Sequence, residues 1–215
     1  MLKKFHMEDC KPVSTFMITS CKLTKDDESK EVDQRLNRSM IGSMLYVIAS
    51  RPDVMQAIGQ VERFQVAPNE THIIEVKRIF RYLKGTMDFG LWYPKGNELI
   101  LIAYLDVDWA GCVDDRRSTS GTASFLGSFL VSWPRKKKSS VSLLTTEAEY
   151  IVAASCCTQI MWMKQTIQDI HVICNEPIPI LCDNTSSISI SKNPIMHSKT
   201  KHIPIKFHFV REQVT

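Results

Sequence analysis

The sequence lacks a long apolar run. No stretch approaches the roughly 18 consecutive apolar residues that mark a membrane-spanning helix. The first ten residues carry Lys3 and Lys4 and then turn polar, so they also lack the apolar centre of a secretory signal. These two absences argue against an integral membrane protein and predict an intracellular chain without a membrane partner.

Paired cysteines are missing as well. The chain has seven cysteines, an odd number, and none stands in a C-x-x-C pair. Cys156 and Cys157 are adjacent, which suits neither a disulfide framework nor a zinc site. Reduced and mostly buried thiols are therefore expected.

A strong net charge is absent too, because 27 Lys and Arg residues stand against 23 Asp and Glu residues, which gives +4. Such a small excess does not by itself predict nucleic-acid binding. The basic residues nevertheless cluster, and such clusters either neutralise phosphates or form an ordinary solvated surface. The clusters are Arg116-Arg117, residues 135–138, and Lys192, Lys199, Lys201 and Lys206.

The first part of the chain reads as a linker followed by helices. Residues 1–32 are polar and irregular and predict one short helix and a linker. In residues 33–94 apolar side chains recur at helical spacing, as Leu36, Met40 and Met44 do. The predicted helices start at residue 33 and end before Pro52, then span residues 53–64 and 70–84, with Gly85 as the C-cap of the last.

The second part, residues 95–215, changes to strand-like patterns. Short runs of β-branched and aromatic residues are separated by turn residues, and a long helical run follows them. This order of elements predicts an α/β domain. The predicted strands are residues 90–94, 99–106, 122–126, 129–133, 141–144 and 177–182, and the predicted helices are residues 146–170, 185–191 and 205–212.

Three acids stand where an α/β sheet places functional groups. Asp106 ends one apolar strand, Asp183 ends another, and Glu149 lies in the first turn of the long helix. Carboxylates at strand ends meet at one edge of a sheet, where divalent cations offset their mutual repulsion. Hard oxygen ligands suit Mg²⁺ or Mn²⁺, so the three acids are a candidate metal site.

Each acid also has a structural alternative. Asp106 could simply end a strand and begin a turn. Glu149 could complete a capping box with Thr146. Asp183 and its neighbour could cap the following helix. The spacing alone leaves both interpretations open.

Four strings in the second part resemble the RNase H domains of Copia-type retrotransposons, in order and spacing as well as in letters. Upstream, residues 46–52 (YVIASRP) and 76–85 (VKRIFRYLKG) resemble the end of the reverse transcriptase of the same elements. The likeness is to plant elements. The four strings are YLDVDWAGCVDDRRSTSG at 104–121, SLLTTEAEY at 142–150, CDNTSSI at 182–188 and HSKTKHI at 197–203.

The resemblance implies an RNase H-like mixed sheet with flanking helices, preceded by a small thumb- or connection-like helical segment. It implies metal-dependent hydrolysis of RNA in RNA–DNA hybrids, with Mg²⁺ or Mn²⁺ as the cofactor. Asp106, Glu149 and Asp183 match the catalytic and metal-binding acids of the family. The aspartates of the polymerase would precede residue 1, so no polymerase activity is expected from this chain.

The resemblance also implies partners and further site residues. The expected partner is an RNA–DNA hybrid, in a cytoplasmic particle or the nucleus. The rest of a reverse transcriptase, or a second copy of the chain, would cover apolar side chains such as Met40 and Phe80, which are expected to be exposed without the missing palm. The implied nucleic-acid-binding residues are Arg117, Ser118, Asn184, Lys199 and Lys201, and His197 is a candidate proton shuttle.

One position departs from the family pattern. Many Copia-type domains carry a fourth acid after Lys-His-Ile, where this chain has Pro204. Proline offers no metal ligand and no backbone N–H, so turnover depends on whether Glu212 or a water substitutes. The alternative hypothesis is therefore a catalytically inactive polyprotein relic, or a co-opted host protein that binds nucleic acid or another partner.

Overall fold

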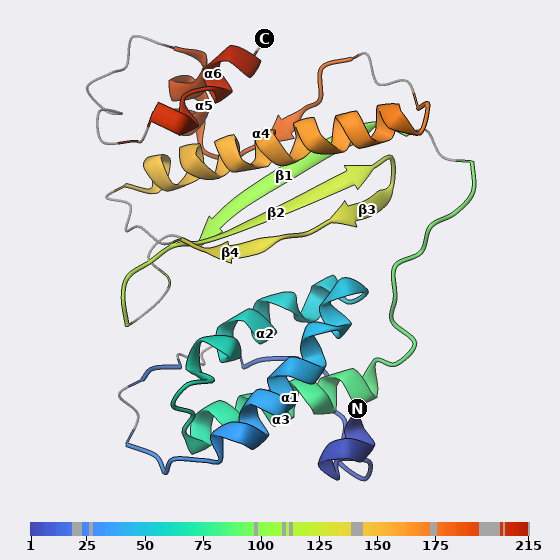
Figure 1. The fold of residues 1–215 in the computed structure, drawn as a ribbon, viewed down its shortest axis with the longest axis vertical. Helices are drawn as coiled ribbons and strands as arrows, with labels where there is room; N and C mark the ends of the chain where they lie inside the picture. The colour runs from blue at the N-terminus through green and yellow to red at the C-terminus, as the bar shows by residue number, and fades with distance from the viewer. Residues whose placement is uncertain are drawn as a thin grey trace. The chain divides into compact units, whose positions relative to one another are not determined.

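The chain forms two compact units, Met1–Leu91 and Trp92–Thr215, in a computed structural model (Figure 1). Within the described residues, no helix is both long enough and apolar enough to cross a membrane. The described residues are 1–18, 23–25, 28–96, 99–108, 111, 114–138, 144–172, 176–193, 203 and 205–214.

Three α-helices build the first unit, as the apolar periodicity predicted. The first begins where the Asp33 side chain accepts a hydrogen bond from the backbone N–H of Arg35 at 2.8 Å. The third begins where Nδ1 of His72 accepts a hydrogen bond from the backbone N–H of Asn69 at 2.9 Å. The elements are α1 (Gln34–Leu45), α2 (Met55–Val61) and α3 (Glu70–Gly85), with 3-10 turns at Leu2–Phe5, Val47–Ala49, Pro52–Val54 and Glu62–Phe64.

The helices of the first unit enclose an apolar core. Met40 and Phe80 are 1% and 0% exposed, so the expectation that these two side chains are exposed is wrong, whereas Leu45 at the end of α1 is 45% exposed. The N-terminal residues provide part of the cover, because the Phe5 ring packs edge-on against the Phe80 ring with centroids 5.4 Å apart. Leu36 is 41% exposed. This first residue of the predicted four-residue pattern therefore lies off the buried face of α1.

Residues 1–17, here called the N-terminal strap, run beside α3 and join it by hydrogen bonds. Nε of Arg81 donates to the carbonyl of Lys11 at 2.8 Å. An Nη of Arg78 donates to the Thr15 hydroxyl at 2.7 Å. The strap is therefore part of the first unit. Although its sequence is irregular, it packs against α3 instead of acting as a free linker.

Gly85 shows how closely the strap approaches α3. A Cβ added at Gly85 would lie 3.0 Å from Cβ of Pro12, tighter than an ordinary contact. The predicted C-cap role of Gly85 is wrong, because Gly85 is the last residue of α3 and Thr86 is the cap. The glycine is required by the close approach of the strap.

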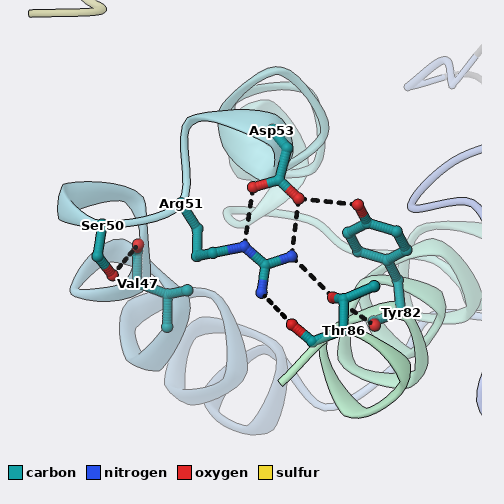
Figure 2. Close-up of polar contacts among 6 residues, drawn as sticks. All are labelled: Val47, Ser50, Arg51, Asp53, Tyr82 and Thr86. Atoms are coloured by element: carbon teal, nitrogen blue, oxygen red, sulfur yellow. Dashed lines mark hydrogen bonds and ion pairs between the residues drawn. The ribbon is translucent and has the colours of Figure 1, made fainter. Parts of the chain in front are cut away.

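An ion pair between the buried Arg51 and the half-buried Asp53 joins the turn before α2 to the end of α3 (Figure 2). The guanidinium of Arg51 binds both carboxylate oxygens of Asp53, at 2.9 and 2.7 Å. It also donates to the carbonyl and hydroxyl oxygens of Thr86, at 2.8 and 2.7 Å. The Tyr82 hydroxyl donates to Asp53 at 2.8 Å. We call these four residues, Arg51, Asp53, Tyr82 and Thr86, the Arg51 cluster. Within it the charges of Arg51 and Asp53 are paired.

A five-stranded mixed sheet with flanking helices builds the second unit. The strand order is β3-β2-β1-β5, with β4 also paired to β2, and only β1 and β5 run parallel. This arrangement fits the RNase H-like fold that the sequence predicted. The elements are β1 (Leu101–Asp108), β2 (Thr119–Leu126), β3 (Phe129–Ser132), β4 (Arg135–Lys137), α4 (Thr145–Asp169), β5 (Ile180–Leu181), α5 (Thr185–Lys192), a 3-10 turn (Ile205–Phe207) and α6 (Val210–Gln213).

Helix α4 covers one face of this sheet (Figure 1). Leu101 and Ala103 of β1 pack in one cluster with Cys156 and Ile160 of α4. Because side chains alternate along a strand, Asp106 lies on the opposite face of the sheet. Leu101 and Ala103 therefore face α4, whereas Asp106 faces away from it.

Several predicted elements differ in the structure. Strand β4 was not predicted, because Arg and Lys have little preference for strands, and it forms by pairing with β2. Proline lacks the N–H that a ladder needs, which shortens the proline-containing runs. The predicted strand 90–94 is absent, 177–182 shrinks to Ile180–Leu181, 205–212 divides into two short pieces, and residues 141–143 of the predicted strand 141–144 lie outside the described residues.

Candidate functional site

Glu149, near the start of α4, is held by two side chains from the segment after β5. Its Oε1 accepts a hydrogen bond from Nδ2 of Asn184 at 3.2 Å. Its Oε2 accepts one from the thiol of Cys182, with a sulfur-to-oxygen distance of 3.3 Å. The capping-box alternative is wrong, because Leu144 is the N-cap of α4 and no side chain caps that helix.

Asp183 lies beside Glu149. Asn184 is the N-cap of α5, since its Oδ1 accepts a hydrogen bond from the backbone N–H of Ser187 at 3.0 Å. Asp183 is exposed and does not share that capping role. One carboxylate oxygen of Asp183, one of Glu149 and the sulfur of Cys182 all lie within 4.8 Å of one another. Two of the three predicted acids therefore converge.

Asp106 is the third predicted acid, and it does not join this group among the residues that the structure describes. It lies within β1, opposite Gly121 of β2, and is exposed. The parallel ladder between β1 and β5 ends with Tyr104 paired to Leu181. Continued by two residues, the same register would set Asp106 beside Asp183, but the ladder stops before that row.

The donors of this group suit a hard divalent cation. The carboxylates of Glu149 and Asp183 are ligands that Mg²⁺ and Mn²⁺ prefer. Cys182 differs: burial, together with the neighbouring Glu149, raises the pKa of its thiol to about 11, although a backbone hydrogen bond involving Asn184 opposes the shift. The thiol is therefore neutral at neutral pH and acts as a hydrogen-bond donor. Sequence reasoning missed Cys182, and its only signal was its place directly before Asp183.

Glu147, the other acid in the same string, has different neighbours. It is 9% exposed and lines a cavity of about 290 Å³ together with Thr146, Thr185 and Ser189. Glu149, rather than Glu147, is thus the acid of α4 that lies with Asp183.

The predicted nucleic-acid residues have different surroundings. The Arg117 side chain is 44% exposed, and its Nε lies 3.6 Å from Oδ2 of Asp115. Ser118 is only 1% exposed, so its side chain is not available at the surface. Asn184 lies at the acid group, as described above. Lys199, Lys201 and His197 lie outside the described residues.

Glu212, the predicted substitute for the fourth acid, is an exposed residue of α6 and is not among the clustered ligands of the described chain. Pro204 lies outside the described residues. Near α6, the Tyr150 hydroxyl and Nδ1 of His208 are hydrogen-bonded at 3.1 Å, a contact that joins α4 to the segment before α6.

Comparison with known proteins decides the family. The chain is 38% identical, over its whole length, to the retrovirus-related Pol polyprotein from transposon RE2 of Arabidopsis thaliana. It is 37% identical over its whole length to the corresponding polyprotein from transposon TNT 1-94 of Nicotiana tabacum. The chain belongs to the Copia-type, retrovirus-related Pol polyproteins. It spans about 15% of the length of the Arabidopsis relative.

This Pol chain is therefore retrotransposon-derived. It is also 37% identical, over 58% of its length, to a secreted RxLR effector protein of Plasmopara viticola, of which the match covers 89%. No family model matches the chain. No solved structure matches it either.

Proposed function

We propose that the second unit is a ribonuclease H that hydrolyses the RNA strand of RNA–DNA hybrids with Mg²⁺ or Mn²⁺. The observation that carries the proposal is the convergence of Glu149 and Asp183, which come from two different elements and present oxygens within 4.8 Å. Like charges repel at such a distance, and a bound divalent cation removes that penalty. The polymerase aspartates of the family have no match in this chain, so the proposal includes no polymerase activity.

Each residue of the site has a defined part in this proposal. Glu149 and Asp183 would hold the metal. Asp106, which lies on the sheet face opposite α4, is the third acid of the proposal and stands outside this group in the structure. A divalent cation, when bound, supplies an activated water and stabilises the leaving oxygen of the phosphodiester. Asn184 and Cys182 keep the Glu149 carboxylate in place through one hydrogen bond to each oxygen. No side-chain nucleophile is needed.

Cleavage of a labelled RNA–DNA hybrid by the purified chain, with Mg²⁺, with Mn²⁺ and with EDTA, tests the proposal. Asp183→Asn should lower metal-dependent cleavage by more than about 100-fold, because it removes a ligand rather than a supporting partner. Asp169→Asn, at the far end of α4, is the matched control and should cleave like the original chain. Equal cleavage by both variants would refute the site.

A second candidate function is hybrid binding without turnover, by a relic or a co-opted host protein. Two observations favour it: Asp106 stands apart from the other acids, and Pro204 replaces the fourth acid of the family. A folded chain that binds hybrid but does not cut it with either metal would support this candidate. Gain of cleavage in Pro204→Asp would then identify the missing carboxylate as the cause.

A further inference from the structure

The edge strand β4 shares rows of the sheet with the two aspartates of β1. Gly121 of β2 is paired with Asp106 on one side and with Arg135 of β4 on the other. Adjacent strands lie about 4.8 Å apart, so the two spacings on either side of β2 put the backbones of the acid and the base roughly 10 Å apart. The pattern repeats in the next row on this face, where Thr119 is paired with Asp108 and with Lys137.

These residues also share one face of the sheet, because directly paired positions point the same way. That face is the one opposite α4. Between Asp106 and Arg135 stands Gly121, which has no side chain, and a Cβ added there would meet nothing within 4 Å. No side chain therefore stands between Arg135 and Asp106 at the paired position of β2.

Two cations at this edge already converge on one anion. Nζ of Lys137 lies 2.8 Å from Oδ2 of Asp115, and Nε of Arg117 lies 3.6 Å from the same oxygen. The backbone N–H of Arg117 donates to the other oxygen of this carboxylate at 3.3 Å. The Asp115 carboxylate thus shows that an oxyanion fits between the two side chains. Such pairs on a partly exposed surface are weak, so a stronger anion can displace the carboxylate.

The charge of the surrounding segments suits a polyanion. Residues 114–117 and 135–138 carry six basic side chains against two acidic ones. A surface that neutralises phosphates in this way binds nucleic acid through its backbone, without reading sequence.

We propose that Arg135, Lys137 and Arg117 form a phosphate-binding strip that seats the backbone of an RNA–DNA hybrid at the β4 edge of the sheet. Asp115 occupies the strip in the free protein and is displaced by a phosphate. The strip would hold the duplex so that one strand crosses Gly121 toward Asp106. This inference rests on the proposed nuclease function for the kind of duplex, whereas binding itself needs no metal.

Fluorescence anisotropy with a labelled hybrid in EDTA, over a series of salt concentrations, tests the strip on the full chain. The double variant Arg135→Gln/Lys137→Gln should flatten the plot of log affinity against log salt by about 0.9 for each phosphate that the variant no longer neutralises. The matched control is Lys77→Gln/Lys164→Gln, which removes the same charge from α3 and α4, outside the basic clusters named above. Equal slopes in the two double variants would overturn the proposal.

Asp115→Asn provides an independent test, because it should strengthen hybrid binding, whereas Arg135→Gln/Lys137→Gln should weaken it. Removal of the resident anion should tighten hybrid binding several-fold, which a destabilised protein would not do. Weaker binding by a variant with an unchanged circular dichroism spectrum would show that Asp115 does not compete with phosphate and would overturn the displacement. Cleavage is measured separately with Mg²⁺, so a chain that binds through the strip but does not cut refutes only the nuclease proposal.

Discussion

The two units use carboxylates in opposite ways. In the first unit Asp53 is enclosed with Arg51, which is 7% exposed, and receives a further hydrogen bond from Tyr82. In the second unit Glu149 and Asp183 lie together, Asp183 is exposed, and neither forms an ion pair with a basic side chain of the described residues. The Asp53 carboxylate is thus neutralised by a side chain of the fold. The Glu149 and Asp183 carboxylates would be neutralised by the proposed cation.

The contrast separates a structural charge from a candidate functional one. Loss of Arg51 would leave the half-buried Asp53 charge without its partner, so the Arg51 cluster is tied to the stability of its unit. Two like charges side by side oppose folding unless something binds them. The ion pair is thus explained by the segments that it joins, whereas the acid pair is where the proposed cation would bind.

The largest effect that tests this contrast is expected from Arg51→Ala. It should lower the free energy of unfolding of the first unit by about 3 kcal/mol, because Asp53 would remain partly buried without its partner. Urea denaturation measures the change. Arg35→Ala, an exposed arginine of α1, is the matched control and should shift the same quantity by less than about 0.5 kcal/mol. A loss no greater than that of the control would contradict a structural role for the cluster.

A smaller effect is expected from Asn184, which has two roles at once. Asn184→Ala removes both the cap of α5 and the hydrogen bond to Glu149. Asn184→Ser keeps an oxygen for the cap but removes the amide donor. Both variants should lower hybrid cleavage or Mn²⁺ affinity by about 10- to 100-fold, as removal of a partner of a metal ligand does. Only Asn184→Ala should also lower the melting temperature. Cleavage by Asn184→Ser at the original rate would show that the Glu149 hydrogen bond is not used.

The smallest effect is a dependence of stability on pH in the first unit. Desolvation acts to raise the pKa of Asp53, but the hydrogen bonds from Arg51 and Tyr82 and the charge of Arg51 outweigh it, so the pKa is lowered. A lowered pKa stabilises the fold above the unfolded value of about 3.9, and this contribution is lost as the pH falls through the folded value. Melting temperatures between about pH 2 and pH 6 should therefore fall toward the acid end. Asp53→Asn should flatten that curve, and parallel curves would contradict the assignment.

Much of the fold could be predicted because its main elements carry periodic signals. Helix α3 and strand β1 each present a regular apolar face, and each was found within a few residues of its bounds. Strand β4 could not be predicted, since three basic residues become a strand only when β2 offers an edge. The role of Cys182 was equally hidden, because its hydrogen bond to Glu149 joins two distant parts of the sequence.

The sequence predicted which acids belong to the candidate site better than it predicted how they are placed. Asp183 and Glu149 were named from the strings that surround them, and they converge in the structure. The placement of Asp106 depends on where a two-residue parallel ladder stops, which no local pattern encodes. A short strand with prolines before it is a weak determinant of register.

The N-terminal strap has a consequence for the genes that encode such chains. A deletion of residues 1–17 would leave α1, α2 and α3 intact in sequence, yet it would uncover the side of Phe80 that Phe5 covers. It would also strip the partners of Arg78 and Arg81 from the helix. The product would present quality-control proteases and chaperones with an opened helix. A deletion far from the acids of the second unit would thus act on the abundance of the chain through the fold of the first unit.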